Sequence, residues 1–196
     1  MKLKTKKIIG ILLLSQLIFV SFAQAQNVYH NSRGHFSFTI PQGWEEIPQS
    51  VVNDASAGAT QMARRTITYI AGFTTQAQYP YMYIQLDSSG RMSETKIQQI
   101  ATPARQKKIL GIAENGLKDL PIELGKLVYQ KEMNAIYQTN IANNGGRRIV
   151  NLAVLMFYKF GFVTLSFNSL EENYEKDASE IDAIINSFKF DEGYRY

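Results

Sequence analysis

The stretch Arg147–Tyr158, RRIVNLAVLMFY, decides the fold that we expect for this chain. Read as a strand, it is apolar on both faces, with Val150, Leu152, Val154 and Met156 on one and Ile149, Ala153, Leu155 and Phe157 on the other. A strand of this kind must lie inside a sheet, with other elements packed over each side. The sequence therefore predicts a central strand in a sheet that is covered on both faces.

Strand-like segments on both sides of this stretch supply its expected neighbours. They are rich in β-branched and aromatic residues, end at turn residues, and cover His35–Ile40, Met62–Ala71, Tyr81–Leu86, Leu127–Glu132, Ala135–Ile141 and Phe162–Phe167. The turns Asn143–Gly146 and Lys159–Gly161 favour hairpins, so the sheet should be antiparallel.

Helical segments should cover this sheet. One helix is expected to begin at Ser93, and Pro103 divides the stretch so that Thr102 caps a second helix, which ends at Asn115-Gly116. Near the C-terminus, Ser169 and Glu172 have the spacing of a capping box that starts a final helix. Its buried stripe would comprise Tyr174, Ala178, Ile181 and Ile185. An antiparallel sheet covered by helices indicates an α+β fold.

The first 25 residues have the pattern of a cleaved export signal. Met1–Lys7 is basic, Ile8–Val20 is apolar, and Ala23-Gln24-Ala25 provides the small residues of a cleavage site. The apolar run is shorter than the ~20 residues that cross a bilayer, which makes an uncleaved anchor the less favoured alternative. We therefore expect cleavage between Ala25 and Gln26, and no stable membrane span after processing. A single domain would cover residues 26–196, in the periplasm or outside the cell.

Charge and composition exclude several classes of protein. The 196 residues contain 21 Lys and Arg against 17 Asp and Glu, and four of the lysines belong to the export signal. The remaining chain carries 17 charges of each sign, so no nucleic-acid surface is indicated. Arg147 and Arg148 would point to opposite faces as solvated strand ends. With 45% hydrophobic residues and no cysteine, the composition is that of a globular domain without disulfides.

Two segments near the ends of the mature chain carry a family resemblance: GHFSFTIPQGW at Gly34–Trp44 and IINSFKF at Ile184–Phe190, the second after a long strand pair and an acidic amphipathic helix. Together they resemble the PsbP-like (Mog/PsbP) superfamily, in the form of an exported bacterial-type member. The resemblance implies an α/β/α sandwich with a central antiparallel sheet flanked by helices. It also implies an accessory or chaperone-like role through binding of a partner rather than through catalysis.

A row of three tyrosines is the one candidate binding face. Tyr79, Tyr81 and Tyr83 should project to the same side of a strand. They would either cover the sheet beneath a helix, with their hydroxyl groups at the rim, or form an aromatic patch for a peptide or glycan. Pro80 confines the row to a strand start or a sheet edge, where rings are often half exposed. At an edge, an extended peptide could add as a further strand.

Phe36, Phe38, Pro41, Gly43 and Trp44 are expected to be structural. Pro41 and Gly43 should end the first strand, because proline cannot donate to a ladder and glycine permits positive φ. Trp44 is the only tryptophan, and it should pack against the apolar face of that strand.

No catalytic, cofactor-binding or metal-binding set is evident in the sequence. The only histidines, His30 and His35, would lie ~17 Å apart in an extended segment, too far for one metal ion unless the chain folds back. Ser93–Lys96 has the S-x-x-K spacing, and Gly111–Lys118 superficially resembles a phosphate loop, but both are better explained as helix ends. Carboxylates distant in the sequence could still meet in space.

Three functional hypotheses follow, and none of them requires a cofactor. The leading one is an exported, non-catalytic domain that binds another envelope or secreted protein. The alternative is a protein that binds a small peptide or glycan on the tyrosine-lined face. The third is a hydrolase built on carboxylates.

Overall fold

The computed structural model describes residues 27–63, 65–88, 90–100, 102–105, 107–108 and 122–195. Its centre is an eight-stranded sheet in the order β3-β4-β5-β10-β9-β8-β6, in which β7 also pairs with β8. Its strands are β3 (Trp44–Glu46), β4 (Tyr69–Thr75), β5 (Tyr81–Asp87), β6 (Ile122–Glu123), β7 (Leu127–Gln130), β8 (Ala135–Asn144), β9 (Arg147–Tyr158) and β10 (Gly161–Leu170). A three-stranded sheet contains β1 (Asn27–Asn31), β2 (Phe36–Ile40) and β11 (Lys189–Phe190).

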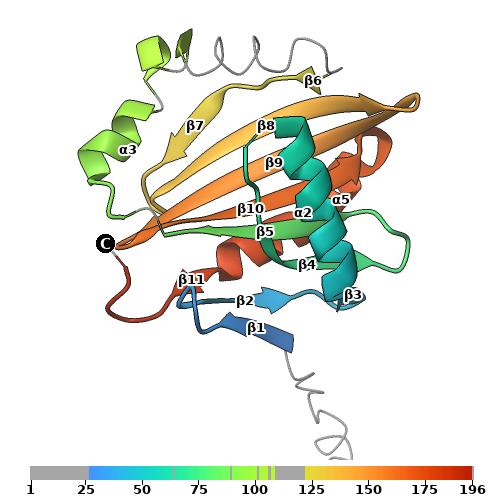
Figure 1. Ribbon diagram of the computed structural model, residues 1–196, viewed down its shortest axis with the longest axis horizontal. Coiled ribbons are helices and arrows are strands. Elements are labelled where there is room, and N and C mark those ends of the chain that lie inside the picture. The colour runs from blue at the N-terminus through green and yellow to red at the C-terminus, as the bar shows by residue number, and fades with distance from the viewer. Residues whose placement is uncertain are drawn as a thin grey trace, which may run out of the picture.

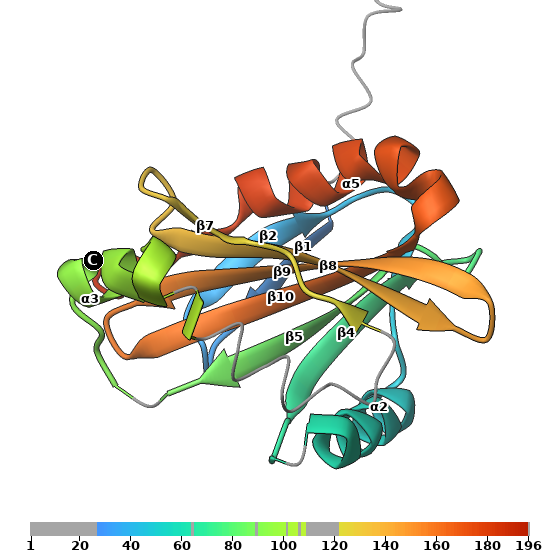
Figure 2. The same ribbon diagram turned by 90° about the horizontal axis from the view of Figure 1, so that it is seen from above.

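Helices lie on both faces of the large sheet (Figures 1 and 2). The 3-10 turn η1 (Glu171–Asn173) leads into α5 (Tyr174–Ser187), which packs on one face together with the small sheet. The helix α2 (Gln49–Ala63) lies across the opposite face. On that same face, α3 (Glu94–Ile100) packs through Ile97 against Ile136 and Phe157. The predicted α/β/α sandwich with a central antiparallel sheet is therefore confirmed.

The strand β9 lies at the centre of the sheet, as its two apolar faces predict. It pairs with β10 on one side and with β8 on the other. The β8–β9 turn depends on Gly145 and Gly146, whose φ values of 59° and 84° lie in the left-handed region. Two consecutive residues of this kind form the tight hairpin turn that matches the twist of the flanking strands.

The main hydrophobic core fills the space between the large sheet, α5 and the small sheet, and we call this side of the large sheet the packed face. Its largest side chains are less than 2% exposed and include Phe36, Phe38, Phe73, Met82, Phe167, Ile181 and Ile184. Burial of apolar area on this scale is the principal source of stability in a domain without disulfides. The packed face therefore holds the fold together.

The prediction of a strand over Met62–Ala71 is wrong. Met62 and Ala63 are the last residues of α2, and β4 begins only at Tyr69. The helix begins after Pro48, whose carbonyl accepts hydrogen bonds from the amides of Val51 and Val52. Only Val52 is buried among its fifteen residues, so no apolar stripe of helical period marks this helix in the sequence.

The predicted capping box is also wrong. Ser169 lies in β10, is fully buried, and donates a hydrogen bond to Oδ2 of Asp177 at 2.6 Å. Neither η1 nor α5 has a side-chain cap at its first turn, because the chain runs directly from the strand into the 3-10 turn. The final helix itself is confirmed, and Ile181, Ile184 and Ile185 are its buried residues.

Other expectations fall partly outside the described residues. Ser93 precedes α3 and accepts a hydrogen bond from the amide of Lys96 at 3.3 Å, as a capping residue would. Pro103–Arg105 is helical, whereas the predicted end at Asn115-Gly116 is not described. The export signal and its cleavage site are not described either and remain predictions. Within the described residues, no helix has the length and apolar character that a bilayer span requires.

Candidate functional site

The face of the large sheet opposite the packed face carries a groove of about 570 Å³. Its floor consists of side chains from β5, β10, β9 and β8. One wall is α2, which Figure 2 shows standing off the sheet, and the other wall is formed by Ile122 and Leu124. We call this side of the sheet the open face and the hollow the groove.

Two hydroxyl groups hold α2 over the edge of the sheet. Ser56 Oγ accepts a hydrogen bond from the amide of Tyr69 at 2.9 Å. Thr60 Oγ1 accepts from the amide of Ile67 at 2.9 Å and donates to its carbonyl at 3.0 Å. The helix is therefore fixed mainly by polar contacts to the segment that enters β4, and not by a stripe of large apolar side chains.

Small residues of α2 face the groove. Ala55, Gly58, Ala59 and Ala63 line it, together with Met62, which is 60% exposed. A Cβ atom placed on Gly58 would meet no heavy atom within 4 Å, so this position faces open space. Four of the five α2 residues that line the groove have no side chain or only a methyl group, which leaves the hollow beneath the helix.

Tyrosine rings form a continuous cluster along the groove. Tyr83 stacks on Tyr69 with ring centroids 4.8 Å apart, and Tyr81 contacts Tyr83 and Tyr79 at 5.5 and 5.4 Å. Tyr69, Tyr81 and Tyr83 line the groove, whereas Tyr79 precedes the strand and extends the ring row beyond it. Gly72 makes room for this packing, because a Cβ there would lie 2.8 Å from the Tyr83 ring.

The row lies at a strand start and not at a sheet edge. Pro80 comes immediately before β5, and β5 pairs with β4 on one side and β10 on the other. Pro80 allowed either a strand start or a sheet edge, and the structure has a strand start inside the sheet. Addition of a peptide strand beside the tyrosines is therefore excluded. Tyr79, Tyr81 and Tyr83 are all half-buried.

Burial controls the protonation of these phenols. It raises the pKa of Tyr69, Tyr81 and Tyr83 above the ordinary value of 10.0, because the charged phenolate loses its hydration. For Tyr81 the neighbouring phenols raise the pKa further. At physiological pH the rings are therefore neutral and can donate or accept hydrogen bonds.

An amide ladder crosses the floor of the groove beside the tyrosines. Asn140, Asn151 and Asn168 lie directly opposite one another on β8, β9 and β10, in register with Tyr81 on β5. Asn140 Nδ2 donates to Asn151 Oδ1 at 3.3 Å, and Asn151 Nδ2 donates to Asn168 Oδ1 at 3.0 Å. Asn151 Nδ2 also lies 2.9 Å from Ser166 Oγ. The floor is a connected row of half-buried amide and hydroxyl groups.

The segment after β6 fixes the far end of this ladder. The amide of Gly125 donates to Asn140 Oδ1 at 3.3 Å, and Gln138 Nε2 donates to the Gly125 carbonyl at 3.1 Å. A Cβ on Gly125 would lie 1.8 Å from the carbonyl oxygen of Thr139, so only glycine permits this approach. The contact orients the Asn140 amide.

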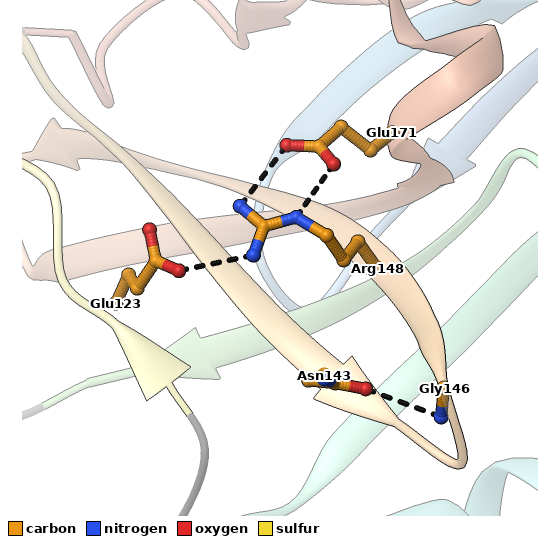
Figure 3. Close-up of polar contacts among 5 residues, drawn as sticks. All are labelled: Glu123, Asn143, Gly146, Arg148 and Glu171. Carbon is orange, nitrogen blue, oxygen red and sulfur yellow. Dashed lines mark hydrogen bonds and ion pairs between the residues drawn. The ribbon is translucent and has the colours of Figure 1, made fainter.

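Arg148 fastens β6, and with it this wall of the groove (Figure 3). Its Nε and Nη2 donate to the two carboxylate oxygens of Glu171 at 2.6 and 3.2 Å, and its Nη1 donates to Glu123 at 3.1 Å. Hydrogen bonds to Glu171 and Glu123 raise the pKa of the Arg148 guanidinium. The expectation of a merely solvated strand end missed this double ion pair, because both acids are distant in the sequence.

The groove has an uncharged lining. All of its lining residues within the described part of the chain are apolar, aromatic, hydroxyl or amide residues. The sequence identified Tyr81 and Tyr83 but missed the amide ladder and α2. Asn151 could have pointed to the amide ladder, because it is the one polar residue inside the apolar run of β9.

The two histidines come together elsewhere, because the chain does fold back in the β1–β2 hairpin. Nε2 of His30 and Nδ1 of His35 lie 3.5 and 3.6 Å from one oxygen of Asp191, and the His35 ring stacks on Tyr194 at 3.7 Å. These contacts join the N-terminal hairpin to the C-terminal segment. The described residues contain no group of three or more His, Asp or Glu that could hold a metal ion.

A larger hollow of about 800 Å³ lies beside α3 and includes Arg91, Lys96, Arg105 and Lys108 in its lining. Residues 101, 106 and 109–121 adjoin it in the sequence and lie outside the described part of the chain, as does the Gly111–Lys118 segment. We assign no site there.

The residues predicted to be structural lie on the packed face or in the turn beside it. Phe36 and Phe38 are 0% and 1% exposed. Gly43 has a φ of 86°, and the amide of Trp44 donates to the Pro41 carbonyl at 3.2 Å, which closes the turn. Trp44 is 5% exposed, and its Nε1 donates to Glu180 Oε2 at 2.7 Å. The sequence could not name Glu180 as this partner.

Comparison with known proteins relates the chain through its fold. No family model matches the chain, and no curated protein does. The solved structure of cyanobacterial PsbP (CyanoP) from Synechocystis sp. PCC 6803 is similar, with 15% identity over 84% of this chain and 91% of that chain and a TM-score of 0.54. This similarity shows a PsbP-like fold, as the two end segments indicated.

Two further solved structures are similar at lower scores. LpqN of Mycobacterium tuberculosis, which is involved in cell envelope biogenesis, shares 15% identity over 85% of this chain and 90% of that chain, with a TM-score of 0.46. PA94 of Pseudomonas aeruginosa, a protein of unknown function and putative regulator, shares 13% identity over 80% and 91%, with a TM-score of 0.37.

Proposed function

We propose that this chain is an exported, non-catalytic domain that binds an uncharged small ligand, a peptide or a glycan, in the groove. The observation that carries the proposal is the partly open, uncharged groove on a sheet whose other face is covered by α5 and the small sheet. Export rests on the pattern of Met1–Ala25, whose basic and apolar segments precede a small-residue cleavage site.

The groove has the size and composition of a ligand site. Its volume of about 570 Å³ falls within the ~300–1,000 Å³ usual for such sites. It combines aromatic and small apolar walls with a few convergent polar groups, the combination that fixes a ligand's orientation. This supports the small-ligand hypothesis directly.

Binding of another envelope or secreted protein receives less support from the described surface. The exposed large apolar residues of the described surface are spread over β1, the two ends of α2, β7 and the β9–β10 turn: Val28, Val51, Met62, Val128 and Phe160. A stable protein interface needs ~800 Å² from each partner around a contiguous apolar centre. The scattered residues do not provide such a centre.

The hydrolase hypothesis also lacks support at the groove. Hydrolysis of a glycosidic bond by carboxylates usually needs two acids that flank the bond. The described lining contains amide and hydroxyl groups and no carboxylate. The groove's chemistry therefore favours binding over hydrolysis.

Chemical-shift mapping with probes of both ligand classes tests the proposal. The isotope-labelled protein is titrated with neutral disaccharides and, separately, with end-capped dipeptides. We expect saturable shifts at Tyr81, Tyr83, Ser166 and Asn168 with at least one probe. Shifts confined to other surfaces, or no saturable shift with any probe, would overturn the proposal.

A further inference from the structure

Building on the proposed function, we infer that the ligand in the groove is a neutral glycan, bound with its hydroxyl groups on the amide ladder and its ring faces on the tyrosines. The groove juxtaposes the two kinds of group that a sugar ring requires. Sugar hydroxyls need partners that both donate and accept, and the carbon faces of a pyranose need flat apolar surfaces.

The amide ladder provides donors and acceptors in alternation. Asn168 Nδ2 uses one hydrogen on the Ser166 carbonyl, at 3.2 Å, which leaves its second hydrogen for a ligand. The Ser166 hydroxyl accepts from Asn151 and keeps its own hydrogen to donate. Each amide oxygen of the ladder has two lone pairs and accepts one ladder or backbone hydrogen bond, so a sugar hydroxyl can supply the second.

The ladder is also held in place before a ligand arrives. Asn140 is held by Gly125, and Asn151 is held by contacts to Asn140, Ser166 and Asn168. The β8–β9 and β9–β10 pairings on which these residues stand continue on either side of the ladder, by two or more residue pairs. A polar row fixed on rigid strands loses little conformational entropy when it binds.

The tyrosines provide the apolar surface. Tyr81 lies in register with Asn168, so its ring stands at the end of the amide ladder. Tyr83 is held by stacking on Tyr69, and both rings line the same hollow. A sugar ring resting on Tyr81 would therefore lie within reach of the amide row.

A peptide fits this groove less well. Extended peptides gain affinity by adding their backbone to a free strand edge. In the floor, β5, β10 and β9 each pair with a neighbour on both sides, so the backbone hydrogen bonds are already made. Only side chains project into the groove, so the backbone of a bound peptide would find no free strand edge to pair with.

The lining also selects against charged or wholly apolar ligands. Within the described lining no Lys or Arg is present to pair with the carboxylate or sulfate of an acidic saccharide. Burial of an unpaired charge is strongly unfavourable. A wholly apolar chain would cover the amide ladder without satisfying it, which is also unfavourable.

Calorimetry with defined probes tests the inference. The protein is titrated with the neutral tetrasaccharides of maltose, cellulose and chitin type, with an end-capped tetra-alanine peptide, and with an acidic hyaluronan tetrasaccharide. We expect at least one neutral tetrasaccharide to bind more tightly than both the peptide and the acidic saccharide. Asn168→Leu should weaken that binding about tenfold, because it removes a donor and an acceptor together.

A matched pair of variants separates binding from folding. Tyr81→Leu removes the flat ring face from the groove, and we expect binding to weaken several-fold. Tyr137→Leu removes a ring on the packed face, whose hydroxyl donates to Met133 Sδ, and should leave binding unchanged. Equal effects of the two variants would overturn the inference.

The remaining outcomes are distinguishable. If only the capped peptide binds, and shift mapping places it in the groove, the proposed function stands and the glycan inference is wrong. If neither probe class binds in the groove, both are wrong. Tight binding of the acidic saccharide, or glycan binding that Asn168→Leu leaves intact, would also overturn the inference.

Discussion

The two faces of one sheet serve different purposes in this molecule. On β10, Phe167 is 1% exposed in the main core, whereas the next residue, Asn168, is half-buried on the floor of the groove. The same alternation separates Met82 from Tyr83 on β5. Since successive residues of a strand point to opposite faces, one strand contributes to both the core and the site. The main core can therefore lie on one face while part of the other face, beneath α2, stays open.

The helices differ in the same way. The helix α5 buries Ile181, Ile184 and Ile185 against the packed face. The helix α2 buries only Val52 and is attached through the hydroxyls of Ser56 and Thr60. A helix fixed by polar contacts at one edge leaves room beneath it, which an apolar stripe would have closed.

Neighbouring substitutions on β10 should show the largest contrast between the faces. Phe167→Ala removes a fully buried ring and leaves a cavity, for an expected loss of ~3–5 kcal/mol in the free energy of unfolding. Asn168→Ala should lose less than ~1.5 kcal/mol, because it removes only net hydrogen-bond energy at a half-buried position. Urea denaturation of both variants checks this. Similar losses for the two would mean that the faces do not differ as described.

Trp44 tests the margin of the packed face. We expect Trp44→Ala to destabilise the protein by ~3 kcal/mol, through lost packing and the lost hydrogen bond to Glu180. Chemical unfolding measures the effect, and Trp44→Phe, which keeps an aromatic ring, should lose less. A loss below ~1 kcal/mol for the alanine variant would place Trp44 among surface residues.

The sequence predicts the packed face of the sheet better than it predicts the open face. The packed face and β9 follow from alternating apolar residues, and the end segments indicated the PsbP-like fold. The open face was only half predicted: Tyr81 and Tyr83 stood out as aromatic rings. The amide ladder joins residues of three strands, so it can be recognised only once the register of those strands is known.

Two features of the structure leave no recognisable pattern in the sequence, for physical reasons. The helix α2 consists largely of small and polar residues, so its period carries no apolar signal, and its end resembles the start of a strand over Met62–Ala71. The ion pairs of Arg148 join residues 23 and 25 positions away in the sequence, and no local pattern reveals them.

Gly58→Ala should stabilise the protein, in contrast to the substitutions on the packed face. The added Cβ meets nothing within 4 Å, and alanine favours the helix interior by ~0.5–1 kcal/mol over glycine. Thermal and urea unfolding measure the gain. A destabilised variant would mean that this position of α2 does not face open space.

The smallest expected effect is that of pH. The lining carries no charge, and the tyrosines stay protonated because burial raises their pKa above 10.0, so ligand affinity should be constant between about pH 5 and 9. The contribution of these tyrosines to stability should fall above about pH 10, where the unfolded chain releases phenolic protons that the folded state retains. Calorimetry across this range checks the first statement and urea unfolding the second. A change of ligand affinity with pH near neutrality would mean that an ionisable group lies in the groove.

The most direct test of the central claim, that the open face is a binding groove separate from the stabilising core, is the ligand affinity of Gly58→Leu relative to Gly58→Ala. Both variants keep the helix, and only leucine is long enough to reach into the hollow and obstruct it. With the oligosaccharide or capped peptide that binds the wild-type protein, we predict at least tenfold weaker binding for Gly58→Leu, with unfolding free energies within ~1 kcal/mol of each other. Equal affinities of the two variants at equal stability would contradict the account.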